Sequence, residues 1–169
     1  MGADGAAVNV IPTLRLAAPL LEDFVYLAAR MRPDEVAQFL AIAGLTDYHA
    51  DTAARAFANI RGPAYVLVNA QGYPIVAGGF EPLRPGVFEG WQVGTMDGWA
   101  THGRAITRVN RRLLNALLAD EAHRVQTIAL TSRTDAHRYY EALGMTCEGV
   151  LHKHFTDGQD GLLYARTSP

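Results

Sequence analysis

Cysteine is almost absent from the sequence, with Cys147 the one example among 169 residues. A single cysteine excludes a disulfide within the chain and a cysteine-rich metal site, and it fits a reducing compartment. No cysteine–histidine signature surrounds this residue, so we interpret Cys147 as a small, buried hydrophobic side chain.

Long apolar runs are also missing. None approaches the roughly 18 residues of a membrane-spanning helix, and the N-terminal MGADGAAVNV lacks the basic and apolar regions of a signal peptide. The sequence therefore predicts a soluble, unexported protein located in the cytoplasm, without a membrane partner. Residues 1–9 are expected to form a flexible tail.

Neither sign of charge dominates, because the formal net charge is -2 and the pI is near 6.3. A chain that binds nucleic acid through much of its surface usually carries a basic excess, so nucleic acid is not expected as the main partner. The hydrophobic content of 49% is enough for one sizeable core. With no repeat or low-complexity linker, residues 10–169 are predicted to form a single domain.

The first third of the chain is mainly helical in pattern. A short strand is expected over residues 10–17 and a helix follows Pro19, with Phe24 and Leu27 at helical spacing. Pro33 at the start and Gly44 at the end predict a second helix over residues 33–43. A third helix, capped by Thr46 or Asp47, is expected to end near residue 60.

The pattern changes to strands after residue 62. Residues 64–70 and 73–80 predict a hairpin, and residues 87–95 a further strand. A helix to about residue 119, a strand at 125–132, a helix at 134–143 and a last hairpin at 147–155 and 162–166 follow. This order predicts an α/β fold with a mixed, mainly antiparallel sheet, helices on both faces, and one parallel crossover through the central helix.

Residues 87–118 join an apolar strand to a two-faced helix. Ile106, Val109, Leu113 and Leu117 recur at helical spacing, with arginines 104, 108, 111 and 112 on the opposite face. We interpret the join between strand and helix as a candidate phosphate-binding turn, because helix N-terminal amides bind anions. The arginine face has an alternative interpretation as an ordinary solvated surface.

The segment AHRYYEALGM, residues 136–145, resembles a helix signature of the GNAT superfamily of acyl-CoA N-acyltransferases. Its matching positions are Ala136, Tyr140, Glu141, Gly144 and Met145. The asparagine that often opens this motif in the family is replaced by an arginine at 133. Together with the element order, the resemblance covers about residues 13–166.

A second motif resembles the acetyl-CoA pyrophosphate loop of the family. It falls on residues 100–105, where Gly103 and Ala105 supply the small positions. Ala100 occupies the opening position, where the family has a basic residue or Gln, and His102 and Arg104 carry charge that would replace it. The resemblance implies that backbone amides of residues 103–105 bind the phosphates, assisted by Arg108.

The resemblance implies transfer of an acetyl group from acetyl-CoA to a primary amine by direct attack, without a covalent enzyme intermediate. In this scheme the strand around Val93 positions the thioester and Tyr140 protonates the departing thiolate. Tyr139 is the adjacent alternative. Acetyl-CoA and an amine acceptor are then the expected partners, and a homodimer remains open.

A general base is harder to assign. Glu89 is our prediction, and it shares a strand face with Trp91 and Val93. The alternatives are Glu81 and Asp97, at strand ends beside the presumed cleft, and water. No metal is expected, because His152 and His154 alternate onto one strand face without a third ligand nearby.

Three segments, ARMRPDE, GWQVGT and HGRAITR, resemble GNAT-type proteins of tailed bacteriophages. This narrower resemblance implies an alternative function. The chain would then be a non-catalytic virion or assembly protein that keeps the fold, in the virion or host cytoplasm.

Overall fold

The computed structural model describes residues 14–169. The predicted tail at residues 1–9 and the start of the first predicted strand, residues 10–13, lie outside the described residues. The remainder of that strand is β1, Arg15–Ala17. Among residues 14–169, none of the helices combines the length and apolar character needed to cross a bilayer.

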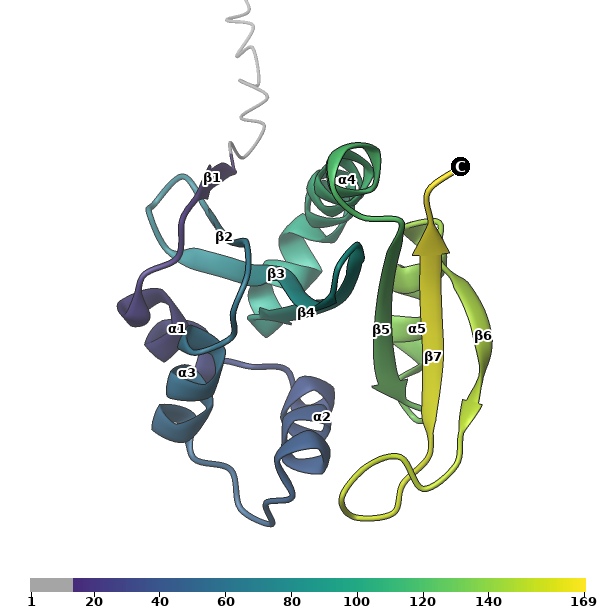
Figure 1. The fold of residues 1–169 in the computed structure, drawn as a ribbon. Helices are drawn as coiled ribbons and strands as arrows, with labels where there is room; N and C mark the ends of the chain where they lie inside the picture. Colours follow the sequence, from purple (N-terminus) through teal and green to yellow (C-terminus); the bar gives the residue numbers. More distant parts are fainter. Residues whose placement is uncertain (1–13) are drawn as a thin grey trace, which may run out of the picture.

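A seven-stranded sheet forms the centre of the structure, in the order β1-β2-β3-β4-β5-β7-β6 (Figure 1). Every neighbouring pair is antiparallel except β4 and β5, which are parallel. This confirms the predicted mixed, mainly antiparallel sheet with one parallel crossover. Its remaining strands are β2 (Ala64–Val68), β3 (Pro74–Arg84), β4 (Val87–Gly94), β5 (Arg124–Leu130), β6 (Thr146–Leu151) and β7 (Gly161–Thr167).

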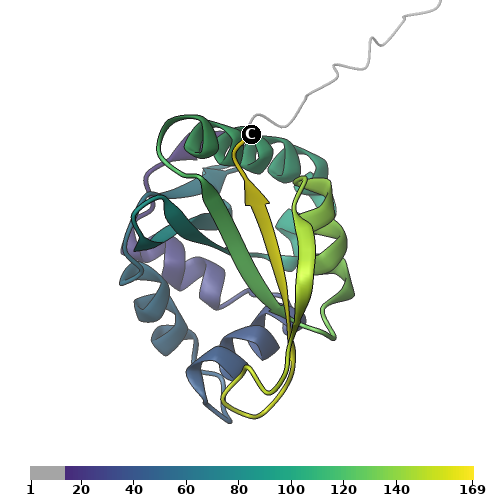
Figure 2. The ribbon, with the colours of Figure 1, turned by 45° about the vertical axis from the view of Figure 1, so that its right-hand side comes forward.

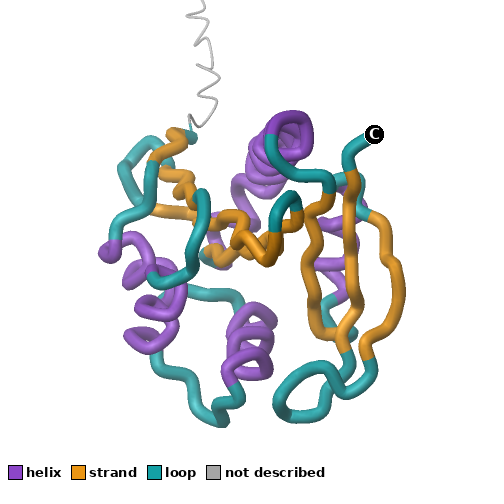
Figure 3. Tube along the Cα trace, in the orientation of Figure 1, coloured by secondary structure: helices purple, strands orange, loops and turns teal. Residues whose placement is uncertain are grey.

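In the described part of the chain, five helices cover the two faces of the sheet, as Figures 2 and 3 show: α1 (Leu21–Ala28), α2 (Pro33–Ala43), α3 (Ala50–Ala58), α4 (Met96–Asp120) and α5 (Thr134–Ala142). On one face, Phe24 of α1 and Ala53 of α3 pack with Val93 of β4. On the other face, Leu114 of α4 packs with Val125 of β5. Both faces bury apolar side chains, which confirms the predicted α/β arrangement.

The first helices test the predicted boundaries. Helix α2 runs from Pro33 to Ala43 as expected, and Gly44 ends it in the left-handed conformation at φ 67°. Helix α3 begins at Ala50, later than the Thr46 or Asp47 cap predicted. The Thr46 hydroxyl instead donates to the Asp47 carboxylate at 2.9 Å, so these two side chains bond each other rather than a helix N-terminus.

Helix α4 begins earlier than the sequence suggested. Thr95 caps it, because its Oγ1 accepts a hydrogen bond from the Gly98 amide at 2.9 Å. Residues 100–105 therefore lie inside a continuous helix, where each amide donates to the carbonyl four residues earlier. Residues 100–105 thus form a helix and not the predicted turn, and phosphate binding by these residues stays a prediction.

The last hairpin corrects two further expectations. Cys147 is exposed rather than buried, because β6 is the outermost strand of the sheet on that side. Strand β6 ends at Leu151 and Lys153 has φ 51°, so His152 and His154 do not alternate along a strand. The Nδ1 atom of His152 instead pairs with Asp160 Oδ2 at 3.0 Å.

Strands β4 and β5 pair over only three residues each. Their register runs from Val87 opposite Arg124 to Glu89 opposite Gln126. Beyond this point β4 continues to Gly94 and β5 to Leu130, and the two strands diverge (Figure 1). The divergence opens the middle of the sheet, so backbone groups on the facing edges need partners other than each other.

Candidate active site

A cavity of about 400 Å³ occupies the space where β4 and β5 diverge. Strand β4 contributes Trp91 and Gln92 to its wall, and helix α2 contributes Glu35. Helices α4 and α5 complete the wall with Trp99, Gly103, Thr107, Asn110, Tyr139 and Tyr140, among others. A concave, largely apolar site with a few converging polar groups is the usual form of a small-molecule site.

The α5 wall carries two adjacent tyrosines. Burial raises the pKa of Tyr140, although the nearby positive charge of Arg133 opposes this. Burial also raises the pKa of Tyr139 well above its usual range. Both phenols are therefore protonated at neutral pH and able to donate a proton. The prediction that Tyr140 faces a cleft agrees with its place on this wall, and its catalytic role stays a prediction.

Tyr139 is fixed by a hydrogen-bonded chain that crosses the cavity wall. The Tyr65 hydroxyl on β2 donates to Asn110 Oδ1 on α4, and Asn110 Nδ2 donates to the Tyr139 hydroxyl at 2.5 Å. Asn110 is only 6% exposed, so losing either partner would leave a buried polar group unsatisfied. This chain joins α4 to α5 and sets the distance between the two helical walls.

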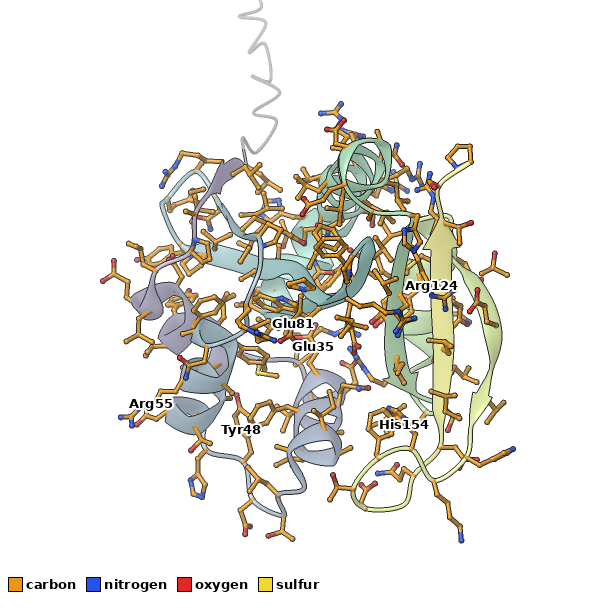
Figure 4. The ribbon with its side chains drawn as sticks, viewed as in Figure 1. Glu35, Tyr48, Arg55, Glu81, Arg124 and His154 are labelled. Carbon is orange, nitrogen blue, oxygen red and sulfur yellow. The ribbon has the colours of Figure 1, made fainter. Side chains whose placement is uncertain are left out.

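Glu35 of α2 projects into the divergence from the opposite side, as Figure 4 shows. Its Oε2 accepts the Gly94 amide at 2.9 Å and its Oε1 accepts Trp99 Nε1 at 3.0 Å. The residue is 5% exposed. Burial raises its pKa from 4.5 to about 7, while the Gly94 and Trp99 bonds and the charge of Arg133 pull in the other direction.

Gln38, one turn later on α2, hydrogen-bonds the backbone of β5. Its Nε2 donates to the Ile128 carbonyl at 3.3 Å, and its Oε1 accepts the Leu130 amide at 2.8 Å. Glu35 thus bonds one backbone amide of β4, and Gln38 bonds one carbonyl and one amide of β5. Helix α2 holds the divergence at a fixed width.

Ion pairs link the N-terminus of α2 to that of α5 beside the cavity. Asp34 contacts Arg32 Nε at 3.1 Å and Arg133 Nε at 3.0 Å. Arg32 also approaches Asp135 of α5 at 3.5 Å. Both arginines line the cavity, so positive charge is held at its wall but is partly neutralised by the aspartates.

The other predicted cofactor residues are scattered. Gly103 lies on the cavity wall, whereas Val93 is fully buried in the core on the α1 and α3 face. Arg104 and Arg108 are exposed on α4. His102 and Ala105 lie on the same helix, and neither lines the cavity within residues 14–169.

Glu89 faces a different space from Tyr140. It lines a separate cavity of about 170 Å³ with Ile42, Ile128 and His154. Burial raises its pKa, and the facing carboxylate of Glu81 adds to the effect. The structure therefore does not bring the predicted base and the predicted acid into one cavity, and the role of Glu89 stays a prediction.

Sequence reasoning did not identify Glu35, although a signal was present. Glu35 lies four residues before Phe39, so the two share one face of α2, and Phe39 is an apolar side chain that packs in the core. A carboxylate on the buried face of a helix is unusual enough to mark a candidate functional group.

Several solved structures with a similar fold carry acetyltransferase names. A GNAT-family acetyltransferase from Bacillus anthracis is 16% identical and superposes with a TM-score of 0.72, over 92% of this chain and 95% of that one. This chain has the GNAT acetyltransferase fold. Spermidine N-acetyltransferase from Vibrio cholerae, solved with CoA and spermine, matches at 16% identity and a TM-score of 0.69, over 92% and 95% of the two chains.

A third GNAT-fold neighbour is the ribosomal-protein-S5-alanine acetyltransferase from Vibrio fischeri, at 14% identity and a TM-score of 0.66, over 92% and 93% of the chains. No family model and no curated protein sequence matches this chain. Identities this low establish the fold alone, so the narrower resemblance to phage proteins stays a prediction.

Proposed function

We propose that the chain is an acyltransferase that moves the acetyl group of acetyl-CoA to a primary amine. The observation that carries this proposal is the cavity between the diverging ends of β4 and β5, with Tyr140 on its wall. A diverging strand pair leaves backbone groups free for a ligand in the plane of the sheet. The tyrosine supplies a protonated acid beside it.

The edge of β4 supports binding of an amide-containing arm such as pantetheine. The Gly94 amide points towards Glu35, away from β3, and alternation places the Gln92 amide on the same edge. Trp91 Nε1 and Gln92 Nε2 are buried without a hydrogen-bond partner among the described residues. A ligand with carbonyl groups would satisfy these donors.

The phosphates of CoA would meet side chains instead of a helix N-terminus. Gly103 faces open space, since an added Cβ would meet no heavy atom within 4 Å. Arg32, Arg133 and Arg138 line the cavity, and His102, Arg104 and Arg108 lie on α4, the helix that carries Gly103. Phosphate binding by exposed charged side chains is weaker and more sensitive to salt than binding by a cluster of backbone amides.

The chemistry requires one bond to form and one to break. The amine nitrogen attacks the thioester carbonyl carbon, and the Gln92 amide is placed to stabilise the charge that develops on oxygen. Collapse breaks the C–S bond, the nitrogen loses one proton, and the sulfur gains one from the Tyr140 phenol. Glu89 is the sequence prediction for the group that takes the proton from nitrogen.

Isothermal titration with acetyl-CoA tests the proposal directly. Binding at micromolar to millimolar concentration, weakened steeply by added salt, is expected from the exposed cationic side chains. Mass spectrometry then detects acetylated product from a panel of benzylamine, tyramine and spermidine. Absence of binding at millimolar acetyl-CoA, or of product from every amine, would reject the proposal.

A second function is favoured by one observation, the uninterrupted start of α4. Because residues 100–105 are helical, the backbone phosphate site implied by the resemblance is not formed. A non-catalytic virion or assembly protein would tolerate that loss. Such a protein is expected in stoichiometric amounts in purified particles and shows no CoA binding, whereas an enzyme is found free with CoA affinity.

A further inference from the structure

We infer that Glu35 is the group that removes the proton from the acceptor amine, in place of Glu89. The inference rests on the proposed acyltransferase function and assigns its general base. Glu35 lines the same cavity as Tyr140, and it lies between the free ends of the two diverging strands. Base and acid would then act on one ligand in one space.

The hydrogen bonds of Glu35 leave it free to accept a proton. Each carboxylate oxygen accepts one N–H group, from Gly94 and from Trp99, and a carboxylate oxygen has two lone pairs. One acceptor site on each oxygen is therefore left for a ligand. The two existing bonds also fix the carboxylate in place, which a base needs in order to reach a defined proton.

Charged and titratable groups face Glu35 from three elements. Arg133 at the start of α5 favours the ionised form, whereas Asp34 on α2 itself opposes it. Tyr140 of α5 and Tyr48, in the loop between α2 and α3, also lie within electrostatic range. Burial is the largest influence and opposes ionisation, so this carboxyl changes protonation state near pH 7.

The proposed step balances as follows. The acceptor arrives as an ammonium ion, and Glu35 takes one proton to give a neutral amine and a carboxylic acid. The amine attacks the thioester, the new C–N bond forms, the C–S bond breaks, and the sulfur takes the Tyr140 proton. The second proton of the nitrogen then passes through water to the Tyr140 phenolate, so Glu35 holds the one proton released overall. Glu35 then returns to its starting state by exchange with water.

Tryptophan provides a direct measure of Glu35 that needs no substrate. The chain has two tryptophans, and the Trp99 indole N–H donates to Glu35, whereas Trp91 Nε1 has no partner within the described residues. In a ¹⁵N-labelled protein the Trp99 indole resonance should shift with pH, with a midpoint near 7. That shift should be absent in Glu35→Gln, and the Trp91 resonance serves as the internal reference.

The kinetic experiment measures benzylamine acetylation from pH 5 to 9 by mass spectrometry, since the exposed thiol of Cys147 would interfere with thiol reagents. We expect kcat/KM of the wild type to rise with a midpoint near 7. Glu35→Gln should lose that rise and fall by roughly 100-fold or more. Gln38→Ala, which removes the matching structural bonds of α2, should keep it.

The outcomes distinguish failure of Glu35 as the base from failure of the acyltransferase function. A Trp99 midpoint near 4.5, or a rise with pH that survives in Glu35→Gln, would overturn Glu35 as the base while the acyltransferase function stands. Absence of wild-type acetylation at every pH for the whole amine panel would overturn both. If Glu35→Gln does not fold, Glu35→Asp replaces it, and that variant should keep the rise with pH at a lower rate.

Discussion

The two helical walls of the cavity, α4 and α5, differ in whether their backbone has the form predicted from their sequence motifs. The α5 wall has the form that its motif implies: a helix over Thr134–Ala142, Gly144 after it at φ 81°, and Tyr140 facing the cavity. The α4 wall does not, because its helix starts at Met96 and absorbs the residues expected to form a turn. The motif residues of α5 therefore adopt the predicted backbone, whereas those at the start of α4 do not.

Local contacts explain the difference. Gly144 adopts a backbone conformation that favours glycine, so the end of α5 is set by the residue that the motif specifies. The start of α4 is set by Thr95 and by Gly98, where an added Cβ would come within 2.7 Å of the Ile75 carbonyl. Neither residue belongs to the six-residue frame at 100–105.

The largest expected effect comes from Tyr140→Phe, which tests the α5 wall. Removing the phenolic proton should lower kcat by about 100-fold to 1,000-fold with little change in acetyl-CoA affinity, because the acid acts only as the thiolate leaves. Steady-state kinetics and isothermal titration measure the two quantities. Equal losses in kcat for Tyr139→Phe and Tyr140→Phe would show that the motif position has no special role.

Glu35 ties the α4 wall to β4, and its burial predicts a stability effect that depends on pH. Folding raises its pKa from 4.5 to about 7, so its favourable contribution is present below 4.5 and is lost as pH rises through about 7. Urea unfolding should show wild type losing about 3 kcal/mol relative to Glu35→Gln between pH 4.5 and 8. Glu22→Gln controls for loss of an exposed carboxylate, and a pH-independent difference would refute the raised pKa.

Much of the fold was predictable because its determinants are local. Pro33 and Gly44 define α2, and two short apolar runs on either side of a Gln-Gly turn define the hairpin of β2 and β3. The site was less predictable from the sequence. The hydrogen-bond partners that fix Glu35 at the cavity are Gly94 and Trp99, which are 59 and 64 residues away in the sequence. Contacts between distant residues leave no periodic signal.

A charge on the α4 wall should weaken CoA binding without affecting folding. Gly103→Glu places a carboxylate where an added Cβ meets no atom within 4 Å, so the helix accommodates it. Repulsion of the CoA phosphates should raise Kd at least 10-fold at low salt, with a smaller effect at high salt. Isothermal titration at two salt concentrations measures this, and unchanged Kd would place the phosphates away from Gly103.

The smallest effect is expected from Gly103→Ala. This variant distinguishes a continuous helix at residue 103 from a phosphate-binding turn. In a continuous helix, replacing glycine with alanine should stabilise the protein by about 0.5–1 kcal/mol, which raises Tm by roughly 1–4 °C. CoA affinity should not change, since a methyl group here meets only open space. If residue 103 instead lay in a phosphate-binding turn, the same methyl group would block the close approach of the ligand. Lower stability together with weaker CoA binding would therefore restore the turn that the sequence predicted, and calorimetry of this one variant measures both.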